Sequence, residues 1–244
     1  MYQPSFEWFY IDVHSENGYD LVFTLHTKPF SSVFDITIWD LFVYKDNRLY
    51  LHHFFTRPQK QLGRQDRPVM LQTDEHNFLQ HNKSGAQLSL SDKEIELDLQ
   101  LEYAPSPQNE YELLADPGPE RSFRWILYAP YCRARGLLRK ANEEIDFTGT
   151  AYHDYNSGNI VLKKELKRWY WKKFYFDERL LIYGDIVDRQ GKVRRILIEV
   201  DEKRRKVMNT VEEEKTDRAL ILKTPEKNWR YQKDKVIQID DIRF

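Results

Sequence analysis

The sequence is short of cysteine and glycine. Its one cysteine, Cys132, excludes an internal disulfide framework and a Cys-rich zinc site, and we expect it to be a small, half-buried hydrophobic residue. Glycine numbers only 9 in 244 residues. No Gly-rich phosphate loop, GxGxxG fingerprint or GxSxG nucleophile elbow occurs, so the sequence predicts neither a nucleotide cofactor nor a serine hydrolase.

Net charge and long apolar runs are also lacking. The 38 Lys and Arg residues nearly balance the 39 Asp and Glu residues, for a formal charge of −1. No global basic field attracts a phosphate backbone, so we expect no nucleic-acid partner. No eighteen uncharged apolar residues follow one another, and the N-terminal MYQPSFEWFY has no basic region before an apolar run. We therefore expect a soluble, cytoplasmic protein without an integral membrane segment.

The spacing of the histidines predicts no metal site, and helical periodicity is scarce. His52 and His53 are adjacent, so on a strand they point to opposite faces. The sequence has no HxH or HxxxH spacing, and we expect no metal site. The one candidate for a short helical turn is residues 209–218, which contain VEEEKTDR. We find no internal repeat.

Aromatic residues, by contrast, are abundant. They make up 14% of a chain whose mean hydropathy is −0.74. A large ring buries about 150 to 250 Å², so aromatic side chains must form much of the core of so polar a chain. We expect some of them to line a cavity.

Short runs with a period of two dominate the sequence. EIELDLQL at 94–101 alternates without a fault, which predicts a half-exposed strand. Similar runs, rich in β-branched and aromatic residues, lie at 6–14, 19–26, 36–44, 49–55, 168–176, 180–187 and 193–200. The clusters SENG, KDNR and DRQGK separate three pairs of them as turns. Closely spaced hairpins favour an all-β, antiparallel barrel or sandwich with little helix.

Two stretches rich in proline and polar residues predict loops, at 54–70 and 103–122. We expect one domain over 1–244, and any boundary between lobes would fall in the 103–122 loop. Such long loops are lids or binding loops in some β proteins and plain surface segments in others.

Alternation also decides which polar side chains share a face. The stretch FTGTAYHDYNSGN at 147–159 places Tyr152 and Asp154 on one face of a strand and His153 and Tyr155 on the other. On the N-terminal strand, Trp8 lies on the face opposite the apolar Phe9, Ile11 and Val13. Only one of the two pairs on the 147–155 strand can point inward, and the mixed face of the N-terminal strand would be either exposed or the lining of a wet cavity.

Two later strands carry a second group of candidates. Trp169 and Trp171 project to one side of their strand, and Tyr183 and Asp185 project to one side of the next. Between the latter two, Gly184 lets another group approach the backbone closely. A wall of indoles beside a tyrosine and a carboxylate would make a reactive surface.

These motifs together resemble the lipocalin-like carotenoid 1,2-hydratase (hydroxyneurosporene synthase) family. The resemblance rests on EWFY at 7–10, WILYAPYCRARGLL at 125–138, GTAYHDYNSGN at 149–159 and the W-x-W of Trp169 and Trp171. It implies a lipocalin- or calycin-like β architecture around an apolar cavity, with no cofactor. Larger members carry a second lipocalin-like domain, for which 244 residues leave limited room, so we expect it to be absent or vestigial.

The resemblance also implies a chemistry and its residues. The hydratase protonates a terminal trisubstituted double bond, and water captures the tertiary carbocation. The family's acid lies in a Tyr-x-Asp element, which Tyr183 and Asp185 match. To be protonated at neutral pH, Asp185 would need a pKa raised by about 3 units, which burial among rings can supply. Substrate binding would fall to His153, Asp154, Trp8, Trp125, Trp169 and Trp171. Of these, Trp169 and Trp171 could stabilise the cation with their π faces.

Two positions differ from the family pattern Tyr-His-Asp-His-Asn-Trp-Gly: Tyr155 replaces the second histidine and Ser157 replaces the tryptophan. The Tyr155 hydroxyl can donate a hydrogen bond or a proton, so we count it with Asp185 and Tyr183 as a catalytic candidate. Three functions stay open: an acid-catalysed hydratase, isomerase or cyclase acting on an isoprenoid- or polyene-like molecule; a non-catalytic carrier of a hydrophobic ligand; and an interaction module with exposed aromatics.

Overall fold

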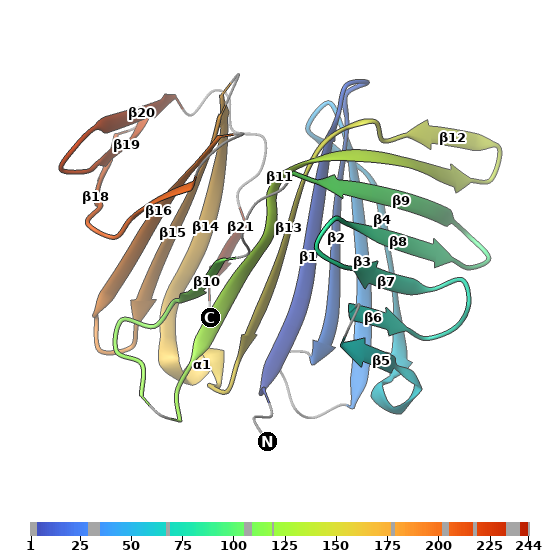
Figure 1. Ribbon diagram of the computed structural model, residues 1–244, viewed down its shortest axis with the longest axis horizontal. Coiled ribbons are helices and arrows are strands. Elements are labelled where there is room, and N and C mark those ends of the chain that lie inside the picture. The colour runs from blue at the N-terminus through green and yellow to red at the C-terminus, as the bar shows by residue number, and fades with distance from the viewer. Residues whose placement is uncertain are drawn as a thin grey trace. The chain divides into compact units, whose positions relative to one another are not determined.

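The first four strands form two antiparallel hairpins, as their turn clusters predict. In the computed structural model they are β1 (Phe6–Ser15), β2 (Tyr19–Lys28), β3 (Ile36–Lys45) and β4 (Arg48–Pro58) (Figure 1). Asp46 and Asn47 have φ angles of 49° and 62°, in the left-handed region that a two-residue hairpin turn requires. The structure describes residues 4–28, 35–66, 69–104, 109–118, 120–176, 179–201, 205–216, 219–232 and 240–243.

The chain folds into two compact units. Unit 1 comprises 1–111 and 123–159, and unit 2 comprises 112–122 and 160–244. The predicted 103–122 loop is therefore divided between the units, and its described part contains the strand β10 (Asn109–Glu112). The single domain over 1–244, with the family's second lipocalin-like domain absent or vestigial, stays a prediction.

Unit 1 is built on one antiparallel sheet with the strand order β4-β3-β2-β1-β13-β11-β9-β8-β7-β6-β5, with β10 and β12 also paired to β11. Its remaining elements are the 3-10 turn η1 (Gln59–Gln61), β5 (Gly63–Asp66), β6 (Val69–Gln72), β7 (Phe78–His81), β8 (Gly85–Ser91), β9 (Glu96–Tyr103), β11 (Phe123–Lys140), β12 (Glu143–Asp146) and β13 (Gly149–Gly158). Strand β13 lies between β1 and β11, as Figure 1 shows, and is paired on both edges.

The core of unit 1 joins residues from both halves of this sheet. Phe9 and Ile11 of β1 belong to the same buried cluster as Leu79 of β7 and Leu97 of β9. Strands so far apart in the sheet order can share a core only if the sheet curls over it. The face of β1 that carries Phe9, Ile11 and Val13 points into this core, as its alternation predicts.

Unit 2 consists of a five-stranded and a three-stranded antiparallel sheet, with orders β17-β16-β15-β14-β21 and β18-β19-β20. The elements are α1 (Leu162–Glu165), β14 (Leu166–Phe176), β15 (Arg179–Asp188), β16 (Val193–Asp201), β17 (Arg205–Met208), β18 (Glu212–Lys215), β19 (Ala219–Lys223), β20 (Asn228–Gln232) and β21 (Asp240–Arg243). Residues of both sheets, among them Tyr183 of β15 and Leu222 of β19, form one buried cluster.

The all-β, antiparallel class is confirmed, and two local predictions are wrong. In place of the helical turn expected at 209–218, β18 forms a strand, because Glu212–Lys215 pairs with β19; residues 217–218 lie outside the described residues. The 54–70 loop is largely structured: β4 runs on to Pro58, and η1 and β5 follow. Its residues 67–68 also lie outside the described part of the chain.

Candidate active site

Strand β13 carries the candidate site of unit 1, and its neighbours fix its position closely. It pairs with β1 from Phe6↔Gly158 to Ser15↔Gly149. At Gly149 a Cβ atom would lie 2.0 Å from the His14 carbonyl oxygen, so only glycine permits this close approach of the two backbones. Strand β11 pairs with the other edge. The side chains of β13 are thereby assigned to two faces of the sheet.

One face carries the Asp154 cluster, which we define as Asp154, Tyr152, Asn156 and Trp125. The indole Nε1 of Trp125 donates to Asp154 Oδ2 at 2.7 Å, and the Tyr152 hydroxyl donates to the same oxygen at 2.5 Å. Asn156 Nδ2 donates to Oδ1 at 3.0 Å. Asp154 is only 3% exposed.

Burial determines the protonation of Asp154. Desolvation raises the pKa of this carboxyl from 3.8 to about 7, although the hydrogen bonds from Tyr152, Trp125 and Asn156 act in the opposite direction. The group is thus poised to hold and release a proton near neutral pH, which is the property of a general acid.

Aromatic rings surround this cluster. The Tyr10 ring lies 6.0 Å from that of Tyr152 in an edge-on arrangement, and the Tyr111 ring lies 5.8 Å from Trp125. Trp8 is paired in register with Asn156 from one side, as Trp125 is from the other. Three of the residues predicted to bind substrate therefore lie on one face of three adjacent strands. They are Trp8, Trp125 and Asp154.

The opposite face of β13 carries His153 and Tyr155, as alternation predicts. The Tyr155 hydroxyl donates to Glu7 Oε1 at 2.6 Å. Glu7 is buried and also accepts from Thr27 and from Arg64, whose Nη1 lies 2.8 and 3.0 Å from the two carboxylate oxygens. Burial and the Glu7 carboxylate raise the pKa of Tyr155 above its ordinary value. Tyr155 therefore holds its proton firmly, and its predicted catalytic role stays a prediction.

His153 lies in a group of rings from four strands. Its Nδ1 is hydrogen-bonded to the Tyr103 hydroxyl, and its ring lies 5.2 Å from His81 and 5.1 Å from Tyr128. Burial, and then the neighbouring His81, lower the pKa of His153 well below its ordinary value. His153 is therefore a neutral imidazole.

In unit 2, the predicted acid Asp185 is clamped by two guanidinium groups. Arg168 Nε and Arg195 Nε each donate to one carboxylate oxygen at 2.9 Å. Asp185 is fully buried, as predicted, whereas the two arginine side chains are 40% and 29% exposed. These contacts make Asp185 an ion-paired anchor between two arginines, and its predicted role as the catalytic acid stays a prediction.

The predicted wall of indoles beside Tyr183 and Asp185 is wrong. Across β14 and β15, Trp169 pairs with Ile186 and Trp171 with Gly184, while the even-numbered Tyr170 pairs with Asp185. Directly paired residues share a face, so the two tryptophans lie on the face opposite Tyr183 and Asp185. Tyr183 packs in the core of unit 2, and its burial raises its pKa.

Sequence reasoning missed several residues that complete these clusters. Glu7, Arg64, His81, Tyr103 and Tyr128 were not singled out. Each lies far along the chain from its partners, and only strand pairing brings them together. The one signal in the sequence was the position of Glu7 in the EWFY pattern. An isolated carboxylate in an otherwise apolar strand needs hydrogen-bond or charged partners.

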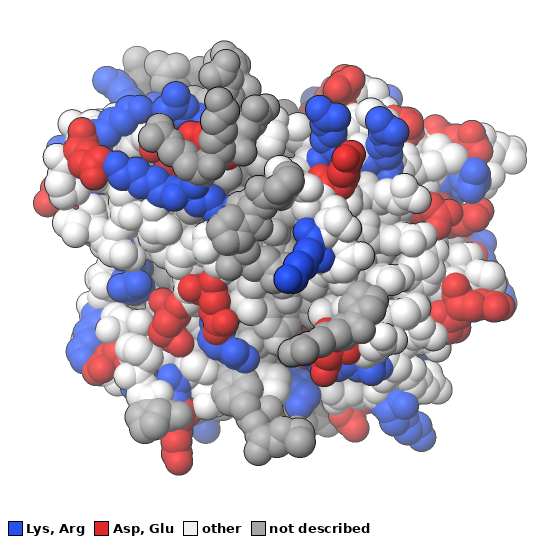
Figure 2. All heavy atoms as spheres, in the orientation of Figure 1, with Lys and Arg blue, Asp and Glu red and all other residues white. Residues whose placement is uncertain are grey.

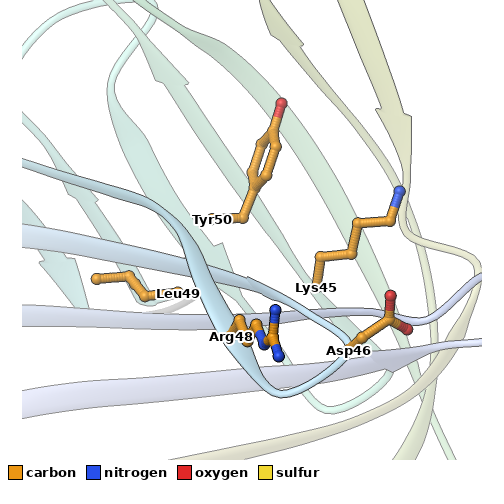
Figure 3. A pocket seen from close by; sticks show the side chains of 5 residues that line it. All are labelled: Lys45, Asp46, Arg48, Leu49 and Tyr50. Carbon is orange, nitrogen blue, oxygen red and sulfur yellow. The ribbon is translucent and has the colours of Figure 1, made fainter.

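A surface hollow of about 480 Å³ lies at the turn between β3 and β4 (Figure 3). It is lined by Lys45, Asp46, Arg48, Leu49 and Tyr50. None of the predicted site residues lines it. The enclosed apolar cavity that the resemblance implies stays a prediction.

Three further findings bear on the kind of site. In the described ranges, no group of three or more His, Cys, Asp or Glu side chains is arranged to hold a metal ion. No helix within them is long and apolar enough to cross a membrane. On the face in Figure 2, basic and acidic side chains are interspersed.

Comparison with known proteins decides the family. The model of the carotenoid hydratase CrtC matches residues 95–238, more than half of the chain. The chain belongs to the CrtC carotenoid hydratase family. The matched region contains β13 and its Asp154, together with the Asp185 anchor, so the predicted resemblance is confirmed.

Relatives of this CrtC-family chain are distant. A hydroxyneurosporene dehydrogenase of Chlorobaculum tepidum is 29% identical over 72 residues, which are 27% of this chain and 19% of that protein. The chain thus matches about a fifth of its curated relative's length.

Solved structures share the fold. Kievitone hydratase from Nectria haematococca has a TM-score of 0.57 and 11% identity, with 90% of this chain and 72% of that chain covered. CghA has a TM-score of 0.62 and 9% identity, with 93% and 74% covered. These likenesses confirm the predicted lipocalin-like β class of this CrtC-family chain.

Proposed function

We propose that this CrtC-family protein is an acid-catalysed hydratase of an apolar, isoprenoid- or polyene-like molecule, with Asp154 as the acid. One observation carries the proposal: a buried carboxyl, held by three donors among aromatic rings, has a pKa of about 7. The family supports the reaction class, and kievitone hydratase of similar fold is also named as a hydratase.

The proposed step balances without a redox group. The protonated Asp154 carboxyl gives its proton to the less substituted carbon of a trisubstituted double bond, which leaves a tertiary carbocation. Water adds to the cation and loses a proton, which returns to the carboxylate. Because no electrons are transferred, this chemistry requires no cofactor. Isomerisation or cyclisation would follow from the same cation if a neighbouring C–H or double bond reacted before water.

The rings around Asp154 would stabilise the cation. The faces of Trp125, Tyr152 and Tyr10 present negative charge density, and a desolvated cation gains about 2 kcal/mol over such a face. Trp125 and Tyr152 have a second role, since both donate to Asp154 Oδ2. When the proton leaves, these two donors stabilise the resulting carboxylate.

The experiment is hydration of an acyclic carotenoid, solubilised in detergent, in D₂O buffer. Wild-type protein should yield a product with the mass of one added water and deuterium on the protonated carbon. Asp154→Asn should lower the rate by at least about a hundredfold, which is the usual contribution of a general acid. Asp98→Asn, on an exposed position of β9, is the matched control and should retain the rate.

Asp185→Asn separates the two possible acids. If a folded Asp185→Asn protein loses hydration while Asp154→Asn retains it, the assignment of the acid to Asp154 is wrong. Deuterium incorporation without added water would replace the hydratase by an isomerase or cyclase.

A hydrophobic-ligand carrier is the second candidate, and the His153 face supports it. The pKa of His153 is lowered and that of Tyr155 is raised, so both side chains are uncharged at neutral pH. Such a face binds a ligand without protonating it. Tight binding of the carotenoid with neither deuterium incorporation nor added water in wild-type protein would favour the carrier.

A further inference from the structure

Two buried histidines form a pair in the core of unit 1, on the face of β13 opposite Asp154. His81 ends β7 and His153 lies in the middle of β13. Their ring centroids are 5.2 Å apart with the planes nearly perpendicular. The Tyr128 ring contacts both, at 4.2 Å from His81 and 5.1 Å from His153. We call His81 and His153 the imidazole pair.

Three of the four ring nitrogens of the imidazole pair make no hydrogen bond to the residues that the structure describes. They are both nitrogens of His81 and Nε2 of His153; only His153 Nδ1 has a partner, the Tyr103 hydroxyl. His81 is 3% exposed and His153 is fully buried. Buried polar atoms are rarely left without a partner, because desolvating them costs free energy that nothing returns. A pair of adjacent imidazoles in this state therefore suggests a ligand.

The protonation of the pair restricts the kind of ligand. Burial lowers the pKa of His81 to about 4 and that of His153 further below its ordinary value. Each ring is therefore neutral, with one N–H donor and one acceptor nitrogen. Such a pair suits a group that both accepts and donates, or that accepts twice, and it offers no charge to an anion or a cation.

We propose that His81 and His153 together bind the hydroxyl or carbonyl oxygen of an apolar small molecule. Phe9, whose ring lies 5.9 Å from His81, and the leucines of β7, β8 and β9 in the same cluster would contact the hydrocarbon part. The site is distinct from the Asp154 cluster, since the two lie on opposite faces of β13. It stands whether or not Asp154 is an acid, because its test measures binding rather than turnover.

The test uses farnesol and its hydrocarbon counterpart farnesene as matched probes, with affinity measured by isothermal titration calorimetry. Wild-type protein should bind farnesol at least about tenfold more tightly than farnesene, the ratio typical of satisfying one buried polar group. His81→Leu, of similar volume, should lose this preference and should melt at the same or a higher temperature. His81→Gln, which keeps a donor and an acceptor, should recover part of the preference.

Trp39→Phe is the control variant. Its indole Nε1 is also buried without a partner among the described residues, but the ring packs on Phe23 and Phe55. This variant should retain the preference for farnesol. The proposal is overturned if wild-type protein binds the two probes equally or binds neither. It is also overturned if His81→Leu melts at a lower temperature with the preference intact, because the imidazole is then only a structural group.

Discussion

Replacing Asp154 by asparagine should change how the stability of the protein depends on pH. The native state holds the Asp154 proton up to a pKa of about 7, whereas the unfolded chain releases it near 3.8. Between these values the native state binds more protons than the unfolded state, so stability falls as pH rises. The contribution of the Asp154 proton to the free energy of unfolding is fully present below pH 3.8 and is lost as pH rises through about 7.

The size of the effect follows from the two pKa values. Moving a pKa from 3.8 to about 7 corresponds to about 4 kcal/mol in total, at about 1.4 kcal/mol per unit. Part of this is already lost at pH 5, because the unfolded carboxyl is mostly ionised there. Between pH 5 and pH 8 we therefore expect wild-type protein to lose about 2.5 kcal/mol more stability than Asp154→Asn.

Urea unfolding at both pH values, followed by tryptophan fluorescence, measures this difference. Comparing each protein with itself removes any constant cost of placing an amide beside the Trp125 and Tyr152 donors. Asp98→Asn serves again as the control and should follow the wild type. A wild-type-minus-variant difference that changes by less than about 1 kcal/mol between pH 5 and pH 8 would refute the reasoning. So would a ¹³C titration of the Asp154 carboxyl with its midpoint near pH 4.

Two further predictions concern other contacts. Asp185→Asn should lower the free energy of unfolding by about 1–3 kcal/mol, because Arg168 and Arg195 lose their buried partner but stay partly solvated; a neutral result in chemical denaturation would contradict the ion-paired anchor. Gly149→Ala should cost about 1–3 kcal/mol or more, since the new methyl would lie 2.0 Å from a backbone oxygen of β1. Gly118→Ala, whose methyl would meet nothing within 4 Å, is its control, and equal melting temperatures for the two variants would show that the close approach relaxes without cost.

The assignment of side chains to faces within one strand could be predicted from the sequence, because the period of two is a geometric property of a strand. Tyr152 and Asp154 do share a face, and the Asp154 hydrogen bonds depend on it. The hairpins also followed from local turn chemistry, as at Asp46 and Asn47.

Pairing between strands could not be predicted in this way. The tryptophans of β14 and the carboxylate of β15 each alternate as expected, but their relative faces depend on the register, which sets Tyr170 opposite Asp185. A shift of one residue would have placed Trp169 or Trp171 beside Asp185. The arginine partners of Asp185 depend on the same register.

Long-range partners were hidden for a related reason. Trp125 and Asp154 are 29 residues apart, and Glu7 and Tyr155 are 148 apart. Nothing in the local pattern indicates which strands become neighbours. In residues 212–215, pairing with β19 also outweighed the helical preference of three consecutive glutamates.

Because β13 is paired along both edges, its backbone acts as a partition. The pairing with β1 runs from Phe6 to Ser15 without a register shift, whereas the pairing with β11 shifts register on both sides of Ala129, the residue paired with His153. The adjacent residues His153 and Asp154 therefore belong to two separate buried clusters, although a single peptide bond joins them.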